Sequence, residues 1–516
     1  MSESTIAPQH GQGAAAPAQP GDLNEQLIAS DFWTDQMLAE AGIPIVDVPF
    51  VTVGGGIGSF VMADYLRISG VPTNSIRVLT PLKTPWESYE YLTTVSQVPR
   101  KERLRSDSQS RPDNIWGFPS YALSEGLHGN IKMLWNVLVE PIFANYFTPK
   151  AGIVFEGIER EMYRIRYPEM VVHGQVRMVR RRVGGGYFTI LTPPEGAAPT
   201  KRIAYRSQFV HVAIGYPGLK YLDDLQNYRS TYNDYKVVNA YESHEHLYEK
   251  LALKPGIVLI RGGGIVASRV LQRLIDDRDQ KGLQTQIIHL FRSYTDKPHG
   301  PSIFKRRKGA DGWAYQGFNY PKSVWGGQLK AQVRKSEGAE RAKLYKEMGG
   351  TNTPFRRNWL EQLSRGRREG WYRVMIGEIT SMKPVGELVE LGLNTDQGPQ
   401  LGTVDFVLDC TGLEADIREH RVLADLLDHS GVGRNPVGRL DVDRSFELRG
   451  AQNGGKIYAV GSATLGGYFP GVDTFYGLQI ACVEVLDDLV RQGFTKKIGP
   501  GRSTSQWWKW MRNKTI

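Results

Sequence analysis

The sequence predicts an α/β protein built from two Rossmann-like dinucleotide-binding domains, one inserted into the other. Two glycine-rich turns lead to this prediction, VTVGGGIGS at residues 51–59 and VLIRGGGIVAS at residues 258–268. Each turn follows a short apolar run and opens a stretch whose apolar residues have helical spacing, which is the context that a phosphate-binding turn requires. Two such turns in one chain indicate two nucleotide sites.

The length and composition set the class of protein. The chain has 516 residues, enough for more than one hydrophobic core, and 41% of them are apolar. Its net charge of +10 favours anionic partners such as phosphorylated cofactors, acidic substrates or lipid headgroups. We find no zinc-ligand spacing and no recognisable nucleic-acid module. The expected partner is therefore a small-molecule substrate, with neither nucleic acid nor a metal; the oligomeric state stays open, a homo-oligomer included.

The cysteines and the hydropathy bear on location. The only two cysteines, Cys410 and Cys482, lie far apart in the chain, which excludes a disulfide scaffold and a Cys-x-x-Cys redox pair. This usage favours a cytoplasmic location. No apolar run reaches the roughly 18 residues that a membrane-spanning helix needs. The first residues also lack the charged-then-apolar plan of a signal peptide.

The expected elements of the first half follow from local pattern. Residues 1–22 have almost no bulky apolar groups and are expected to be disordered, and residues 23–43 have the apolar spacing of one amphipathic helix. The first βαβ unit comprises a strand at 46–53, a helix at 60–69 and a strand at 75–80. Further strands are expected at 151–154, 171–172, 176–179, 188–191 and 209–214.

The second βαβ unit runs from 257 to 291, followed by a basic, glycine-rich insertion at about 293–350. Strands resume near 373–393 and 403–409, and a last nucleotide-type segment covers 456–490. The predicted division is a disordered segment 1–22, the first part of the outer domain 23–235, the inserted domain 236–395, the second part of the outer domain 396–490 and a tail 491–516.

The first turn places Gly54, Gly56 and Ser59 at the three small-residue positions of the fingerprint. Gly54 serves the tight turn, Gly56 lets the backbone reach a pyrophosphate, and Ser59 is small enough for the helix to pack on the strand. An acidic residue normally binds the ribose at the end of the next strand. Here that strand ends at Thr80, and the nearest acid is Glu87.

The second turn carries Gly262, Gly264 and Ala267, and its second strand ends at Arg292. An arginine at this point can pair with a 2′-phosphate through its rigid fork of donors, so the site favours NADPH over NADH. A solvent-exposed surface arginine is the alternative. His289, within the same apolar strand, is expected to be a hydrogen-bonded core histidine.

Three further strand ends belong to the same pattern. Gly215 follows the strand at 209–214, Gly412 follows the strand at 406–409, and Gly461 with Ser462 follows the strand at 457–460. Together with the two turns, they resemble the two-dinucleotide-binding-domain flavoproteins, especially the flavin-containing, Baeyer–Villiger and N-hydroxylating monooxygenases. The resemblance spans about 46–490. It implies that Gly54, Gly56 and Ser59 bind FAD, and that Gly262, Gly264, Ala267 and Arg292 bind NADPH.

The resemblance extends to the strand ends but not to the oxygenase motif. Gly215 and Gly412 match the family's Ala-Thr-Gly strand ends, and Gly461-Ser462 matches its Gly-Asp element near the flavin, with serine in place of the aspartate. The family often has an aromatic-x-Gly-x-x-x-His motif before the second turn. Residues 234–241 stand near that place without the glycine, and the histidines follow only at His244 and His246.

Two aromatic regions have alternative interpretations. The insertion, with basic residues at 305–308 and aromatic residues at 313–325, is expected to be a loop that covers the nicotinamide or substrate site; single-stranded nucleic acid is the alternative. The tail contains Trp507, Trp508 and Trp510 with Lys509 and Arg512, and either docks on the protein or lies in a membrane interface. Trp86, Trp116, Phe118 and Tyr121 line a substrate pocket or pack in the core.

The expected function is that of an NADPH-dependent FAD flavoprotein oxidoreductase of the monooxygenase type. Hydride passes from NADPH to FAD and the reduced flavin reacts with oxygen, while the protein orients the groups and excludes water. The alternative is a flavin dehydrogenase that reduces a quinone or another acceptor without inserting oxygen, which suits the altered oxygenase motif. No side chain is assigned as an acid or base.

Overall fold

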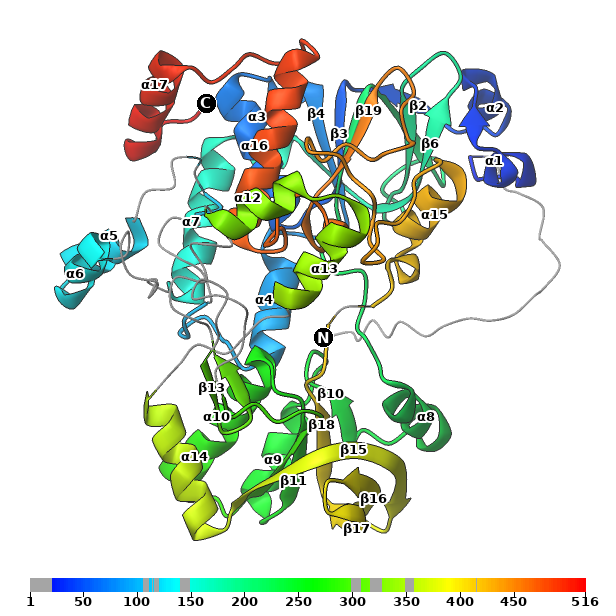
Figure 1. The fold of residues 1–516 in the computed structure, drawn as a ribbon. Coiled ribbons are helices and arrows are strands. Elements are labelled where there is room, and N and C mark those ends of the chain that lie inside the picture. Colours follow the sequence, from blue (N-terminus) through cyan, green and yellow to red (C-terminus); the bar gives the residue numbers. More distant parts are fainter. Residues whose placement is uncertain are drawn as a thin grey trace.

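The computed structural model describes residues 21–104, 111–113, 115, 120–139, 149–297, 308–315, 327–348, 357–413 and 415–516. The predicted disorder of 1–22 therefore falls almost entirely outside the described residues. The chain forms an upper and a lower body (Figure 1). No helix among the described residues is long and apolar enough to cross a membrane.

A five-stranded parallel sheet forms the centre of the upper body, in the order β19-β9-β3-β4-β5. Its strands are β3 (Phe50–Gly54), β4 (Ile76–Thr80), β5 (Val171–His173), β9 (Phe209–Ala213) and β19 (Lys456–Ala459). Strand β3 is a continuous buried run, as expected of a parallel strand covered on both faces. The adjoining helices are α3 (Ile57–Ser69), α7 (Ala151–Arg164) and α16 (Phe475–Arg491), with the 3₁₀ turns η1 (Thr73–Ser75), η2 (Tyr167–Glu169) and η4 (Gly461–Thr464).

A second, mixed sheet lies beside it in the order β1-β6-β7-β8-β2. Its strands are β1 (Phe32–Trp33), β2 (Ile45–Asp47), β6 (Gln175–Arg182), β7 (Tyr187–Thr192) and β8 (Ile203–Ser207), next to α1 (Glu25–Ala29), α2 (Asp35–Glu40), α15 (Arg421–His429) and the 3₁₀ turn η3 (Ile417–Glu419). The strand predicted at 46–53 is therefore two strands in two sheets. Pro49, which has no N–H to donate, lies between them.

Two local predictions in this body are wrong. The helix predicted over 23–43 is broken, because Trp33 is fully buried in an edge strand that pairs with β6, and Thr34 caps a new helix by accepting from the N–H of Met37. The strand predicted at 151–154 is the start of α7. Val154, Ile158 and Met162 are buried at helical spacing, so this face packs against the core.

The lower body contains one sheet in the order β10-β18-β11-β12-β15-β16-β17, parallel as far as β15 and antiparallel beyond it. The strands are β10 (Val237–Asn239), β11 (Ile257–Arg261), β12 (Gln286–Phe291), β15 (Tyr372–Val385), β16 (Leu388–Thr395), β17 (Gly398–Val404) and β18 (Phe406–Asp409). Its helices are α8 (Asp223–Tyr232), α9 (Glu245–Leu253), α10 (Ile265–Lys281) and α14 (Arg357–Glu369), with the hairpin β13 (Lys308–Ala310) and β14 (Trp313–Tyr315). The predicted fold class, two Rossmann-like units with one inserted, is confirmed.

The predicted division between these units needs correction at both ends. The sequence places residues up to 235 in the outer domain, whereas Leu225 and Tyr228 of α8 pack in a cluster with Val237 and Leu259 of the lower sheet. It also places residues 396 onward in the outer domain, whereas β17 and β18 belong to the sheet of the inserted one. Strand β18 lies between β10 and β11 and pairs in parallel with both, and this pairing on two sides outweighs its position late in the chain. The chain returns to the upper body only after Asp409.

The remaining helices connect or flank the two bodies (Figure 1). They are α4 (Glu87–Val95), α5 (Ser120–Leu127), α6 (Lys132–Val139), α12 (Gln328–Lys335), α13 (Gly338–Met348) and α17 (Pro500–Met511). One contact between the bodies is made by Arg269 of α10, which donates to the carbonyl oxygen of Gln97 and forms an ion pair with Glu102 at 2.8 Å.

Candidate functional site

The first glycine turn joins β3 to α3 and cannot accept a side chain at its first glycine. Gly54 has φ +117°, and a Cβ there would collide with the carbonyl oxygen of Ala213 at the end of β9. A Cβ at Gly55 would collide with the side chain of Thr80. The turn is therefore pressed against the ends of the strands on either side of β3.

The third glycine of this turn leaves space where a ligand is expected. Gly56 is the N-cap of α3, no side chain caps the helix, and the nearest atom to a Cβ at Gly56 would be the carbonyl oxygen of Pro85, 4.0 Å away. The first turn of α3 has no acidic residue. The N–H groups at the start of α3 and the positive end of its dipole therefore lie beside the open space at Gly56, which fits a pyrophosphate.

Ser59 supports the turn through a buried polar chain. The Thr52 hydroxyl of β3 lies 3.0 Å from Oγ of Ser59 and 2.9 Å from Nδ1 of His211 on β9. Burial lowers the pKa of His211 to about 3, so the imidazole is neutral. Serine at the third small-residue position thus retains close helix–strand packing and accepts a hydrogen bond from Thr52 of the strand.

Two predicted residues from distant segments meet at this edge. Ser462, fully buried in η4, donates from its hydroxyl to the carbonyl oxygen of Gly215 at 2.6 Å. Gly461 and Gly215 both have positive φ, +81° and +72°. In place of a carboxylate, Ser462 thus joins the ends of β19 and β9.

The acid that normally binds a ribose is absent from the end of β4. Thr80 is buried, and its Oγ1 accepts from the N–H of Leu82. Glu87 begins α4, and its carboxylate accepts from the N–H of Lys83 at 2.6 Å. Thr80 occupies the place at the end of β4 where the acid is usual, and its side chain lies against Gly55 of the turn.

The second glycine turn joins β11 to α10 in the same way. Gly262 has φ +120°, and a Cβ there would lie 2.9 Å from the carbonyl oxygen of Cys410, the residue that follows β18. Gly264 is the N-cap of α10, and a Cβ there would have no atom within 4 Å. Ala267 is fully buried. Gly412 lies just beyond Cys410, so the turn and this strand end are neighbours.

A histidine and an ion-pair network support the second turn. His289 of β12 lies 2.6 Å from the carbonyl oxygen of Gly262 through Nε2 and 2.9 Å from the Tyr372 hydroxyl through Nδ1. Burial, although opposed by the Gly262 hydrogen bond, lowers the pKa of His289 to about 4. The single proton of the neutral ring must therefore lie on Nε2, because a carbonyl only accepts. Sequence reasoning expected a core histidine but missed its contact with the turn.

Arg261, the last residue of β11, was also missed. Its buried guanidinium forms ion pairs with Asp409 at the end of β18 and Asp224 of α8. Asp409 also accepts from the N–H of Thr411, which shapes the Cys410–Gly412 segment. A charged residue at the end of an apolar strand, such as Arg261 or Asp409, can be recognised in the sequence. That the two lie together follows only from the parallel pairing of β11 with β18.

Arg292 follows β12 and is exposed, with no ion-pair partner among the described residues. Its guanidinium is thus available at the same sheet edge as Gly262 and Gly264. The two cysteines are both buried, and burial raises the pKa of both thiols. They lie in different hydrophobic clusters, so they form no redox pair.

The segment at 234–246 is built around the amide of Asn239, the last residue of β10. Asn239 accepts from the N–H of Tyr241 and donates to the carbonyl oxygen of Lys220. His244 is buried with Nδ1 2.7 Å from the carbonyl oxygen of Glu242, and His246 lies 2.9 Å from that of Tyr235. Both histidines therefore bind backbone of their own neighbourhood.

The insertion at 293–350 divides between the bodies. Trp313 is buried against His289, Phe291 and Trp359 in the lower body. Helices α12 and α13 instead lie on the upper body beside α16 (Figure 1), where Arg334 pairs with Glu484 and the Tyr345 hydroxyl donates to the backbone of 467–469. Residues 305–307, Phe318, Tyr320 and Trp325 lie outside the described residues.

The predicted aromatic group is only partly described. Trp86 is buried and stacks on Phe155 of α7, so it packs in the core. Trp116, Phe118 and the side chain of Tyr121 lie outside the described residues.

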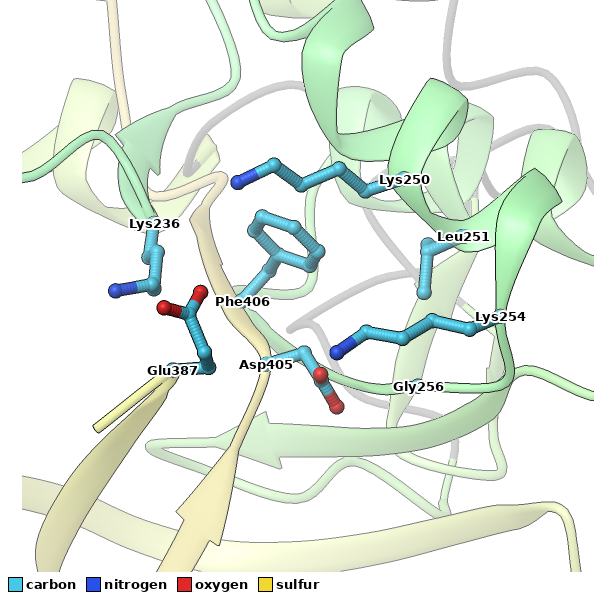
Figure 2. A pocket seen from close by; sticks show the side chains of 8 residues that line it. All are labelled: Lys236, Lys250, Leu251, Lys254, Gly256, Glu387, Asp405 and Phe406. Carbon is cyan, nitrogen blue, oxygen red and sulfur yellow. The ribbon is translucent and has the colours of Figure 1, made fainter. Parts of the chain in front are cut away.

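A separate pocket lies at the opposite edge of the lower sheet. It is lined by Lys236, Gly256 and Asp405, which immediately precede β10, β11 and β18, together with Lys250, Leu251, Lys254, Glu387 and Phe406 (Figure 2). Both glycine turns follow the carboxyl ends of strands. This pocket is at the amino-terminal ends and is therefore not a nucleotide site of the Rossmann type.

The comparisons with known proteins agree with this architecture. No family model and no curated protein sequence matches the chain. Solved structures do match: an ornithine hydroxylase from Pseudomonas aeruginosa has a TM-score of 0.61 at 16% identity over 86% of this chain and 99% of that one. For an ornithine N-hydroxylase from Kutzneria sp. 744, the TM-score is 0.63 at 13% identity, with 87% and 100% covered.

A cadaverine monooxygenase from Erwinia amylovora, solved with FAD, has a TM-score of 0.59 at 13% identity, with 86% of this chain and 95% of that one covered. The chain therefore has the fold of the flavin-dependent N-hydroxylating monooxygenases, which the resemblance in the sequence predicted.

Proposed function

We propose that this chain is an NADPH-dependent FAD flavoprotein, a monooxygenase that acts on a small organic substrate through the reduced flavin. The supporting observation is the pair of matching turns. Gly54 and Gly262 each press on the carbonyl oxygen of a neighbouring strand end, and Gly56 and Gly264 each leave an uncapped helix start open. Two dinucleotides in one chain are what hydride transfer between a nicotinamide and a flavin requires.

The upper turn is the proposed FAD site. Gly54 and Gly56 would hold the pyrophosphate at the start of α3, with Ser59 fixing the helix on β3. Gly215, Gly461 and Ser462 lie at the same edge of the sheet and would face the rest of the flavin nucleotide. With Thr80 at the end of β4, the ribose must be bound by groups other than an acid at that position.

The lower turn is the proposed NADPH site. Gly262 and Gly264 would hold the pyrophosphate at the start of α10, Ala267 allows the helix to pack closely, and Gly412 borders the turn. The exposed guanidinium of Arg292 would pair with the 2′-phosphate, which NADH lacks.

The flavin, when bound, supplies hydride acceptance from NADPH and the reaction with oxygen. The chain's own residues bind and orient. The neutral His211 and His289 hold the two turns without adding charge beside a pyrophosphate, and α12 with α13 covers part of the upper body next to α16. The solved neighbours are named for ornithine and cadaverine, so small primary amines are the substrates to test first.

An anaerobic titration tests this proposal. The purified protein should carry a flavin absorbance spectrum that NADPH bleaches without air. On admission of air, oxygen uptake should rise when ornithine, lysine or cadaverine is present, and hydroxylated amine should form. Protein that purifies without flavin and takes up none from solution would refute both sites.

The second candidate is a flavin dehydrogenase or quinone reductase that inserts no oxygen. The observation in its favour is the segment at 234–246, where the family's glycine is missing and both histidines bind local backbone. In this case NADPH bleaches the flavin, a quinone added without air restores its spectrum, and air yields only hydrogen peroxide with every substrate tested.

A further inference from the structure

Helix α17 has one face fixed to the upper body. Arg502 donates from Nε to the carbonyl oxygen of Ile68 at 2.9 Å, and Gln506 is buried. The Trp510 ring lies under the guanidinium groups of Arg111 and Arg160, 5.5 and 5.1 Å from its centroid. The prediction that the tail docks on the protein therefore holds for this face, and the helix is held in a defined orientation.

The other face of α17 presents large apolar groups to solvent. Trp507, Trp508 and Met511 are 37%, 50% and 57% exposed, and their spacing of one and four residues places them on one side of the helix. The guanidinium of Arg512 lies 4.3 Å from the ring centroid of Trp508. A cation thus sits directly at the edge of the exposed aromatic surface.

The charged side chains of the segment that carries this surface have a single sign. After Asp488 the sequence contains no aspartate or glutamate up to residue 516, and its lysines and arginines are Arg491, Lys496, Lys497, Arg502, Lys509, Arg512 and Lys514. Lys496, Lys497 and Lys514 are exposed and form no ion pair among the described residues. The segment that carries the aromatic face is thus cationic, whereas Asp113 pairs with Arg111 and Arg160 on the docked side of α17.

We propose that the outer face of α17 docks on an anionic lipid bilayer surface, with Trp507, Trp508 and Met511 among the headgroups. Tryptophan beside lysine and arginine is the composition that favours this depth, and basic residues near the surface are attracted to anionic lipids. A second copy of the chain is a poorer occupant, because it would bring the same positive charges to the contact.

The hairpin α5–α6 provides a matched control. Leu127, Ile131, Trp135 and Leu138 are 64–74% exposed. Over residues 120–139, however, the charged residues are Glu125 and Lys132 alone. This hairpin therefore has exposed apolar surface without an excess of positive charge. Variants in it show whether exposed apolar side chains alone are enough for vesicle binding.

The test is cosedimentation of the full chain with vesicles of phosphatidylcholine, with and without phosphatidylserine. At about 0.1 M salt we expect binding only to the phosphatidylserine vesicles, with release at high salt as charges are screened. The variant W507S/W508S/M511S should bind about tenfold or more weakly, as should K509Q/R512Q/K514Q. The control variant W135S/L138S should bind like the parent chain. Apart from the half-buried Lys509, these side chains are exposed, so the melting temperatures should change little.

Three results would overturn the proposal. They are no binding to phosphatidylserine vesicles, an equal loss of binding in the α5–α6 control, and a dimer in solution that the W507S/W508S/M511S variant dissociates. The last result would identify a second copy as the occupant. Vesicle binding and flavin reduction are measured separately, so this proposal fails or stands independently of the proposed function.

Discussion

The two glycine turns have the same backbone geometry, but different side chains hold them in place. In each, a glycine with φ near +120° presses on the carbonyl oxygen of the neighbouring strand end, Ala213 above and Cys410 below. The upper turn is backed by the neutral chain Ser59–Thr52–His211. The lower turn is backed by His289 on the Gly262 carbonyl and by the Arg261 ion pairs.

The glycine fingerprint therefore determines the backbone conformation of each turn, whereas the side chains that support the turn differ between the two sheets. The two units also differ at the end of the strand that follows each helix. Thr80 is buried against Gly55 above, and the exposed Arg292 follows the corresponding strand below. Substitutions at matched positions in the two turns test this difference.

The largest effect is expected for Gly54→Ala. The added Cβ collides with backbone and the φ of +117° is strained for alanine, so we expect a loss of about 3 kcal/mol or more and protein without flavin. Gly262→Ala, whose Cβ would lie 2.9 Å from the Cys410 oxygen, should cost less, about 1–3 kcal/mol.

Melting temperature and bound flavin per chain are the measurements, with Gly402→Ala, an open position in β17, as the control. Equal melting temperatures for Gly54→Ala and the control would contradict the geometry of the upper turn.

Acid should weaken both turns through their buried histidines. His211 and His289 have pKa values lowered to about 3 and about 4, against about 6.5 unfolded. Above pH 6.5 both states are neutral; below it only the unfolded state gains the proton. Stability is therefore lost as pH falls from 6.5 towards each folded value, by about 1.4 kcal/mol per pH unit for each histidine.

The variants His211→Asn and His289→Gln preserve one hydrogen-bonding group each without a titrating ring. Each should flatten the decline of melting temperature between pH 6.5 and about 4. An unchanged acid slope in both variants would show that other groups control the acid sensitivity.

A smaller and selective effect is expected for Arg292→Ala. Loss of a charge-assisted contact with the 2′-phosphate should weaken NADPH binding by about 1–3 kcal/mol and leave NADH binding nearly unchanged. The measurement is the concentration of each cofactor needed to bleach the flavin at half the maximal rate. Equal losses for both cofactors would exclude the 2′-phosphate role.

The smallest effect on stability is expected for Gly56→Ala and Gly264→Ala. Neither glycine has positive φ and neither Cβ meets a close atom, but both glycines are N-caps, where alanine is the poorer residue. This cost offsets the entropy that alanine removes from the unfolded chain, so the stability of the cofactor-free protein should change by less than about 1 kcal/mol. Each variant should nevertheless lose affinity for one cofactor only, FAD for Gly56→Ala and NADPH for Gly264→Ala. Loss of FAD in Gly264→Ala would show that the assignments are exchanged.

The two strand–turn–helix units could be predicted from the sequence, because their glycine positions and apolar runs are local and their chemistry does not depend on distant residues. The position of Arg292 directly after the second strand of the lower unit is likewise local. Which strands share a sheet could not be predicted, because strand pairing joins segments that are distant in the chain. Strand β18, late in the chain, pairs between β10 and β11, and this moved the predicted boundary at 396 beyond Asp409.

The same reason explains the other differences. The hydrogen bonds from Ser462 to Gly215 and from His289 to Gly262, and the docking of α12 and α13 on the upper body, join residues far apart in the chain. The break at Trp33 likewise follows from pairing with β6. Such contacts form when strands and helices bury their faces together, and no local spacing in the sequence encodes them.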